Sequence, residues 1–167
     1  MTNGITHSLV AASALLTLAA CGGSGTATTV AVPTVPCGVS PLGTVSVRRF
    51  CGTGSVSLHR GSTTTALTQA ECTFADGGVT VNGGVLVLGH ASGPAGQLTY
   101  IGVDANPAPA APGGTPTASY RGLVSADLRG RVISVTDASV DLAGTRTSGT
   151  AQGTATDGGR VTVTFSC

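Results

Sequence analysis

Apolar and polar residues alternate in short runs along most of this chain, and valine and threonine dominate the runs. Alternation with period two predicts β-strands that bury one face. No helical periodicity is found after residue 21. The expected strands are 45–47, 56–58, 79–81, 85–88, 98–103, 132–135, 140–142 and 161–165.

Glycines separate these runs and predict tight turns or bulges, because glycine adopts positive φ at little cost. The expected turns lie at Gly61, 77–78, 83–84, Gly130, Gly144 and 158–159. Many short strands joined by close turns predict an all-β fold, as a single antiparallel β-sandwich, barrel or curled sheet. Two stretches rich in small residues and proline fall outside this pattern. They predict a flexible tether over 22–36 and one long mobile loop over 104–119.

An apolar run before the first expected strand closes on Leu18-Ala19-Ala20-Cys21. About a dozen apolar residues are too few to span a bilayer, and this length is typical of an export signal. The four residues resemble the lipobox of bacterial lipoproteins. The resemblance implies cleavage before Cys21 and alkylation of its thiol by a diacylglycerol group, so that covalent lipid holds the protein to a membrane of the cell envelope. By the same resemblance, Gly22 favours the outer membrane in a Gram-negative host.

Two alternatives stay open for this segment. Residues 1–7 contain no lysine or arginine, although export signals normally begin with positive charge. Either the amino terminus and His7 suffice, or the true start lies upstream. An ordinary secretory signal cut without lipidation is the other alternative, but Leu18 would then occupy a site that requires a small residue. The predicted organisation is a signal peptide over 1–20, a lipidated tether over 21–36 and one domain over 37–167.

Charge is scarce in this chain. Charged residues make up 9% of the sequence, and the formal net charge is +1, whereas about 25% is typical of soluble domains. The arginines are spread along the chain, with only Arg48-Arg49 and the near pair Arg129 and Arg131 close together. No basic stripe suited to a phosphate backbone is formed, so we expect no nucleic-acid partner.

Four cysteines remain after the lipobox, and an even number in an exported chain predicts two disulfides. They are Cys37, Cys51, Cys72 and Cys167. Their wide, irregular spacing is unlike that of zinc ligands, so no metal is expected. A hairpin with arms 55–58 and 63–70, extended outward, would bring Cys51 opposite Cys72 and leave Cys37 for Cys167. The pairing of Cys37 with Cys51 and Cys72 with Cys167 stays open, because one bulge residue would change which side chains face each other.

Groups suited to catalysis are few. His59 lies beside an expected turn, His90 follows an expected strand, and Glu71 is the only glutamate. A pair of carboxylates would have to come from Asp76, Asp104, Asp127, Asp137, Asp141 and Asp157. No Gly-x-Ser-x-Gly motif is present. We therefore expect no catalytic residues, no enzymatic activity and no cofactor.

Five aromatic residues are too few and too dispersed to form a stacking surface for sugars or bases, so we expect them to anchor the core or line a sheet face. They are Phe50, Phe74, Tyr100, Tyr120 and Phe165. Asp-Gly-Gly precedes a Val-Thr-Val strand both at 76–81 and at 157–163. A duplicated half-domain and coincidental hairpin chemistry explain this echo equally well. The segment 72–84 weakly resembles short exported bacterial β-proteins of unassigned activity.

These features predict an envelope lipoprotein that acts as a structural or interaction module. The alternative is a carrier of a small apolar molecule or lipid, because a curled β-sheet can enclose a cavity. An internal apolar cavity of about 300 Å³ or more would favour the carrier.

Overall fold

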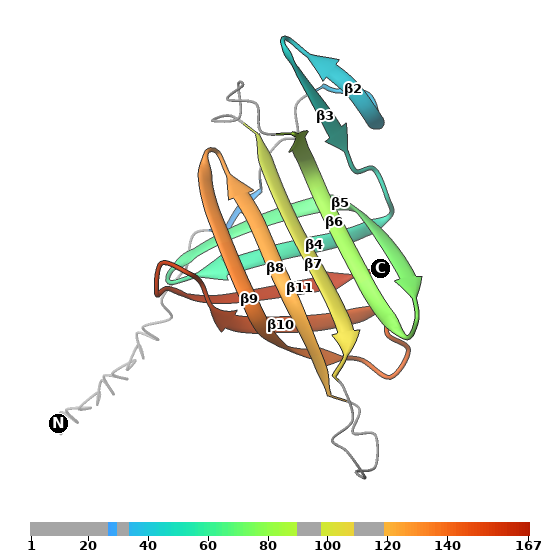
Figure 1. Ribbon diagram of the computed structural model, residues 1–167, viewed down its shortest axis with the longest axis vertical. Helices are drawn as coiled ribbons and strands as arrows, with labels where there is room; N and C mark the ends of the chain where they lie inside the picture. Colours follow the sequence, from blue (N-terminus) through green and yellow to red (C-terminus); the bar gives the residue numbers. More distant parts are fainter. Residues whose placement is uncertain (1–26, 30–33, 90–97, 109–118) are drawn as a thin grey trace, which may run out of the picture.

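The computed structural model describes residues 27–29, 34–89, 98–108 and 119–167, and every regular element in this part of the chain is a β-strand (Figure 1). The all-β prediction is therefore confirmed. In the same residues, no helix has the length and apolarity to cross a membrane. The strands are β1 (Ala27–Thr29), β2 (Gly38–Leu42), β3 (Val45–Arg49), β4 (Gly54–Arg60), β5 (Thr63–Ala75), β6 (Gly78–Leu88), β7 (Thr99–Pro107), β8 (Tyr120–Leu128), β9 (Arg131–Leu142), β10 (Ser148–Thr154) and β11 (Arg160–Ser166).

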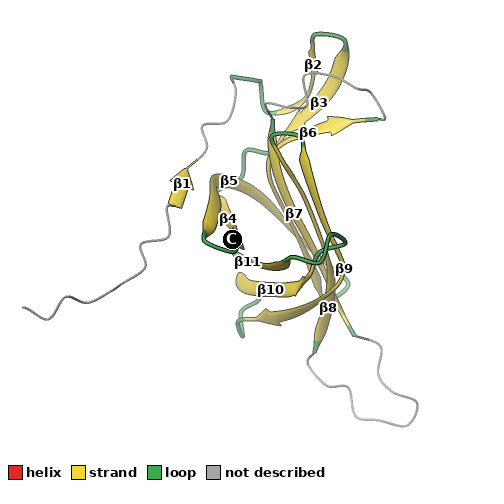
Figure 2. Ribbon diagram, turned by 90° about the vertical axis from the view of Figure 1, so that its left-hand side faces the viewer, coloured by secondary structure: helices red, strands yellow, loops and turns green. Residues whose placement is uncertain are grey.

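Strands β4 to β11 form a closed eight-stranded antiparallel barrel. Each strand pairs with the next in sequence, and β11 pairs back with β4. The barrel is flattened into two layers: β6, β7, β8 and β9 lie in one, and β5, β4, β11 and β10 lie in the other (Figures 1 and 2). The strands of the two layers cross at a steep angle, as in orthogonally packed sheets.

Two long strands, β5 and β9, carry the sheet around the corners between the layers. The first part of β5 pairs with β4, and its last part, from Ala70, pairs with β6. A register shift between Leu67 and Ala70 inserts one extra residue in β5. Strand β9 pairs with β8 and then with β10, and its register with β8 shifts opposite Gly122. Such bulges bend a strand, which is how one strand can serve both layers.

Side chains that point into the barrel form one continuous apolar core. Alternate residues of each strand are buried there, and serine, threonine and charged residues occupy most outward positions. Because a shift of one residue would bury the polar set instead, this alternation fixes the strand register. The largest fully buried members are Leu58, Leu67, Ile101 and Ile133.

A smaller sheet lies outside the barrel. The last part of β6 leaves β7 and pairs with β3, which forms a hairpin with β2 (Figure 2). Val47, Val85 and Leu98 form its separate core together with Val35. Val35 belongs to the predicted tether, as does β1, which pairs in parallel with β5. The signal segment 1–20 and Cys21 lie outside the described residues.

The expected turn at 83–84 is wrong, because 79–81 and 85–88 are parts of the single strand β6. Gly84 has φ of +86°, and a Cβ there would overlap the carbonyl oxygen of Thr99. The glycine thus allows close approach to β7 where β6 changes partner. Likewise, 132–135 and 140–142 belong to one bent strand, β9. The expected loop over 104–119 begins later, since β7 continues to Pro107, and its residues 109–118 lie outside the described part.

Candidate ligand-binding site

All four cysteines of the domain are paired, so the prediction of two disulfides is confirmed. The preferred pairing is wrong: Cys37 bonds Cys51, and Cys72 bonds Cys167. The hairpin arms pair as expected as far as Val56 and Leu67, but the bulge in β5 then shifts the register. Beyond Ala70, β5 pairs with β6, which carries Cys72 away from Cys51.

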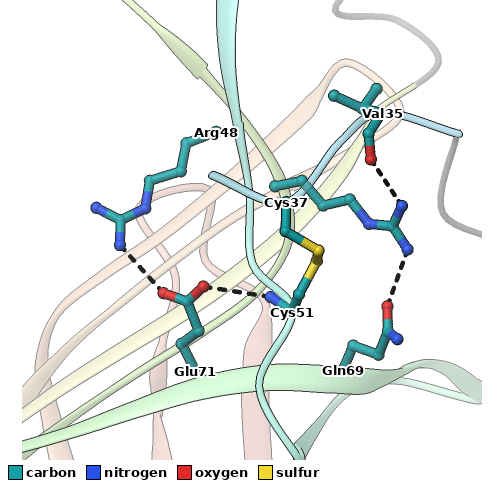
Figure 3. Close-up of a disulfide and its surroundings, with 7 residues drawn as sticks. Val35, Cys37, Arg48, Cys51, Gln69 and Glu71 are labelled. Atoms are coloured by element: carbon teal, nitrogen blue, oxygen red, sulfur yellow. Dashed lines mark hydrogen bonds and ion pairs between the residues drawn. A yellow bond between two sulfur atoms is a disulfide. The ribbon is translucent and has the colours of Figure 1, made fainter. Parts of the chain in front are cut away.

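The bond between Cys37 and Cys51 closes the base of the β2–β3 hairpin beside the barrel (Figure 3). Arg48 forms an ion pair with Glu71 at 3.1 Å, and the other carboxylate oxygen accepts a hydrogen bond from the Cys51 N–H. Arg49 donates to the carbonyl of Val35 and to the side chain of Gln69 on the bulge of β5. The only glutamate of the chain therefore ties the small sheet to the barrel.

The other candidate catalytic residues are dispersed. His59 is exposed and shares a hydrogen bond of 2.8 Å with Thr64, whereas His90 lies outside the described residues. Asp137 pairs with Arg121 on the outer surface, and Asp127 accepts from the Gly130 N–H in a turn. Asp104 accepts from Asn106, Asp76 occupies a hairpin turn and Asp141 is exposed on β9. Among the described residues, no group of three or more His, Cys, Asp or Glu is placed to hold a metal ion.

Aromatic residues lie both inside and outside the barrel. Phe165 is buried in the core, while Phe50 and Tyr100 pack together with ring centroids 5.8 Å apart. The Tyr100 hydroxyl donates to Asn82 at 2.7 Å. Burial raises the pKa of Tyr100, and a hydrogen bond with Ser125 opposes this shift in part. Phe74 does not anchor the core, since it is 51% exposed.

One end of the barrel contains a cavity of about 460 Å³, hereafter the terminal cavity. This open end is the one that carries the β4–β5, β8–β9 and β10–β11 turns. The inward-facing side chains of Leu58, Thr65 and Ile133 form the buried wall of the cavity, and Leu128 contributes at its edge. The alternation along β4, β5, β8 and β9 places these residues inside the barrel.

Three arginines line the terminal cavity, namely Arg60, Arg131 and Arg160. Asp157, in the β10–β11 turn, accepts hydrogen bonds from Arg60 Nη2 at 2.7 and 2.6 Å, and Arg131 lies 3.7 Å from it. The hydrogen bond from Arg60, followed by one from the Gly159 N–H, holds the pKa of Asp157 below its ordinary value. The other terminal nitrogen of Arg60, Nη1, is buried and has no hydrogen-bond partner in the described structure.

The Asp-Gly-Gly echo forms two different turns. Asp76 and Gly77 both have positive φ and join β5 to β6 directly. At the second copy only Gly158 has positive φ, and a longer turn presents the Asp157 carboxylate to Arg60. A side chain at Gly159 would collide with the Arg60 guanidinium, so glycine leaves room for that group. Only the second copy therefore contributes to the terminal cavity.

The terminal cavity was not predicted from the sequence. Its arginines, Arg60, Arg131 and Arg160, are far apart along the chain and belong to no common motif. Comparison with protein-family models, with curated proteins and with solved structures gave no match.

Proposed function

We propose that this protein is a lipid-anchored component of the bacterial cell envelope whose barrel binds a small apolar molecule in the terminal cavity. The observation that carries the proposal is that buried core side chains, Leu58 and Ile133, form the wall of this cavity, unlike the pockets of about 390 and 360 Å³ at the other end of the barrel. The volume of the terminal cavity is about 460 Å³. It exceeds the roughly 300 Å³ at which small-molecule sites begin. An apolar inner wall such as that of Leu58 and Ile133 is typical of small-molecule sites, and the arginines and threonines of the lining supply polar groups that can orient a ligand.

The proposed anchor is a lipid attached to the thiol of Cys21, followed by cleavage of the signal between Ala20 and Cys21. It would place the barrel at a membrane surface, where apolar molecules are concentrated. The outer membrane is the proposed location in a Gram-negative host. Covalent acyl chains contribute about 0.8 kcal/mol for each buried methylene, so two or more chains suffice for stable attachment.

Binding can be tested with phenylnaphthylamine, an uncharged dye that fluoresces in apolar sites. We expect saturable binding to the purified, oxidised protein. Thr65→Phe should abolish it, because the ring would fill the cavity beside Leu58. Thr136→Phe, at an exposed position of β9, is the matched control and should bind normally.

Cooperative unfolding of each variant checks that it folds. If Thr65→Phe perturbs folding, Thr63→Phe at the edge of the same cavity replaces it. Absence of saturable binding, or equal binding by the folded cavity and control variants, would contradict the carrier proposal and leave the structural or interaction module as the better interpretation.

The anchor is tested by Cys21→Ser, which removes the thiol that receives lipid. Mass spectrometry of the native protein should show a diacylated Cys21, and the variant should retain the two disulfides while losing the lipid modification. An unmodified Cys21 in the native protein would contradict the proposed anchor.

A further inference from the structure

We infer that the terminal cavity selects apolar molecules that carry one anionic group, such as a carboxylate, over uncharged or cationic molecules of the same size. This inference rests on the proposed ligand site and specifies its ligand class. Apolar walls would hold the hydrocarbon part, and the arginines at the edge would bind the anion.

The charged side chains at the cavity are mostly positive. Every charged side chain that lines it is an arginine, and the three arginines are accompanied by one carboxylate, that of Asp157. Asp157 is bound mainly to Arg60, since Arg131 lies at 3.7 Å and Arg160 has no ion pair in the described structure. Arginine binds carboxylates well because its planar N–H groups match the two oxygens. Arg131 lies on the same face of β9 as the buried Ile133 and is only loosely paired, so its positive charge remains available for an anion.

The second observation concerns Arg60 alone. Its side chain is only 17% exposed, and Nη1 is buried without an acceptor. A buried donor without a partner costs free energy, and the cost is greater for a charged group. Because Nη1 has almost no accessible surface, an anionic group in the cavity would reach it after a rotation of the Arg60 guanidinium, and would then supply the acceptor that Asp157, bound to Nη2, does not provide. The same site would repel a cation and would leave Nη1 unpaired with a pure hydrocarbon.

The inference is tested by calorimetric titration of the purified full chain, in oxidised form, with decanoate, decanol and decylamine. These probes share one hydrocarbon chain and differ in charge. We expect decanoate to bind about tenfold more tightly than decanol, because one charge-assisted hydrogen bond contributes roughly the free energy of a tenfold change in affinity. Decylamine should bind most weakly. Equal binding of decanoate and decanol would overturn the inference but keep the proposed cavity. Failure of all three to bind would overturn the proposed function itself.

Two substitutions assign the effect to the arginines. Arg131→Gln should weaken decanoate several-fold and leave decanol unchanged, and its exposed side chain makes misfolding a minor concern. Asp157→Asn should tighten decanoate, because it removes the competing carboxylate from Arg60. Arg121→Gln, on the outer surface, is the control and should change neither. Loss of decanol binding together with decanoate, or weaker decanoate binding in Asp157→Asn, would contradict the assignment to an anion site.

Discussion

The two ends of the barrel are built from the same up-and-down strands but differ in how they are filled. At the closed end, Phe165 packs against Gly149, where a Cβ would fall 2.7 Å from its ring. The disulfide between Cys72 and Cys167 fastens the chain there, and Arg146 donates to the carbonyl of Gly77. Surface pockets of about 390 and 360 Å³ border Phe165 and the Cys72–Cys167 bond at this end, but neither enters the apolar core. At the open end, the terminal cavity is walled by the core residues Leu58 and Ile133.

Strand pairing explains this difference. Near the closed end, β5 pairs with β6 from Ala70 to Ala75, so the barrel wall is continuous. Toward the open end, β6 leaves the barrel after Gly84 and pairs with β3, and β5 pairs there with β1 instead. The wall thus loses one strand at the end where the cavity lies. The barrel wall is therefore less complete at the end that contains the terminal cavity, and Gly84 lies where β6 changes partner from β7 to β3.

The largest expected effect concerns the disulfide of the closed end. Removing it with Cys72→Ala/Cys167→Ala should destabilise the protein by about 5 kcal/mol, and Cys37→Ala/Cys51→Ala by about 3, because the longer loop restrains more of the unfolded chain. The two bonds close loops with sequence separations of 95 and 14 residues. Urea denaturation measures both. A greater loss from the Cys37–Cys51 pair would contradict the account, because loop length would then not set the contribution of the closed-end disulfide.

Truncation of one apolar side chain at each end gives the next effect. Phe165→Ala should cost about 3–5 kcal/mol, because it leaves a void in a packed core. Leu128→Ala at the edge of the terminal cavity should cost about 1 kcal/mol, since water already reaches this partly exposed side chain. Thermal and urea unfolding provide the measurement. An equal loss of unfolding free energy in the two variants would show that the side chains around the cavity are packed as tightly as those of the core.

The smallest effect is the pH dependence of the ion pair at the open end. Because the pKa of Asp157 is lowered in the folded state, its contribution to stability is present above its ordinary pKa and is lost as pH falls through the folded value. Wild type should therefore be slightly more stable than Asp157→Asn above about pH 4, and the two should converge in more acidic solution. A difference that grows on acidification would contradict the Arg60–Asp157 pair.

Much of the fold follows from local patterns that the sequence contains. Period-two alternation located strands β3, β4, β6, β7, β9 and β11, and Gly61, Gly130 and Gly158 do have positive φ at turns. Strands β1, β2, β8 and β10 were missed, and β1 lies in the segment expected to be a flexible tether. Strand β10 contains two glycines and no valine, so only its neighbours β9 and β11 make it a strand.

The disulfide pairing and the site depended on long-range geometry. One extra residue in β5 decided which cysteines meet, and no local signal marks that bulge at Thr68 and Gln69. The arginines of the terminal cavity come together only because alternate turns of a closed meander lie at the same end. Arg60, Arg131 and Arg160 each follow or adjoin such a turn, a relation that becomes readable once the strand order is known.

The most direct test of the account is to map bound decanoate by backbone amide NMR shifts on the purified, oxidised protein. We expect the shifts to concentrate on Leu58, Thr65 and Ile133 at the open end, while the amides around Phe165 and Cys167 at the closed end stay unchanged. Saturable binding whose shifts concentrate at the closed end or on the β2–β3 hairpin would contradict the claim that the terminal cavity is the ligand site.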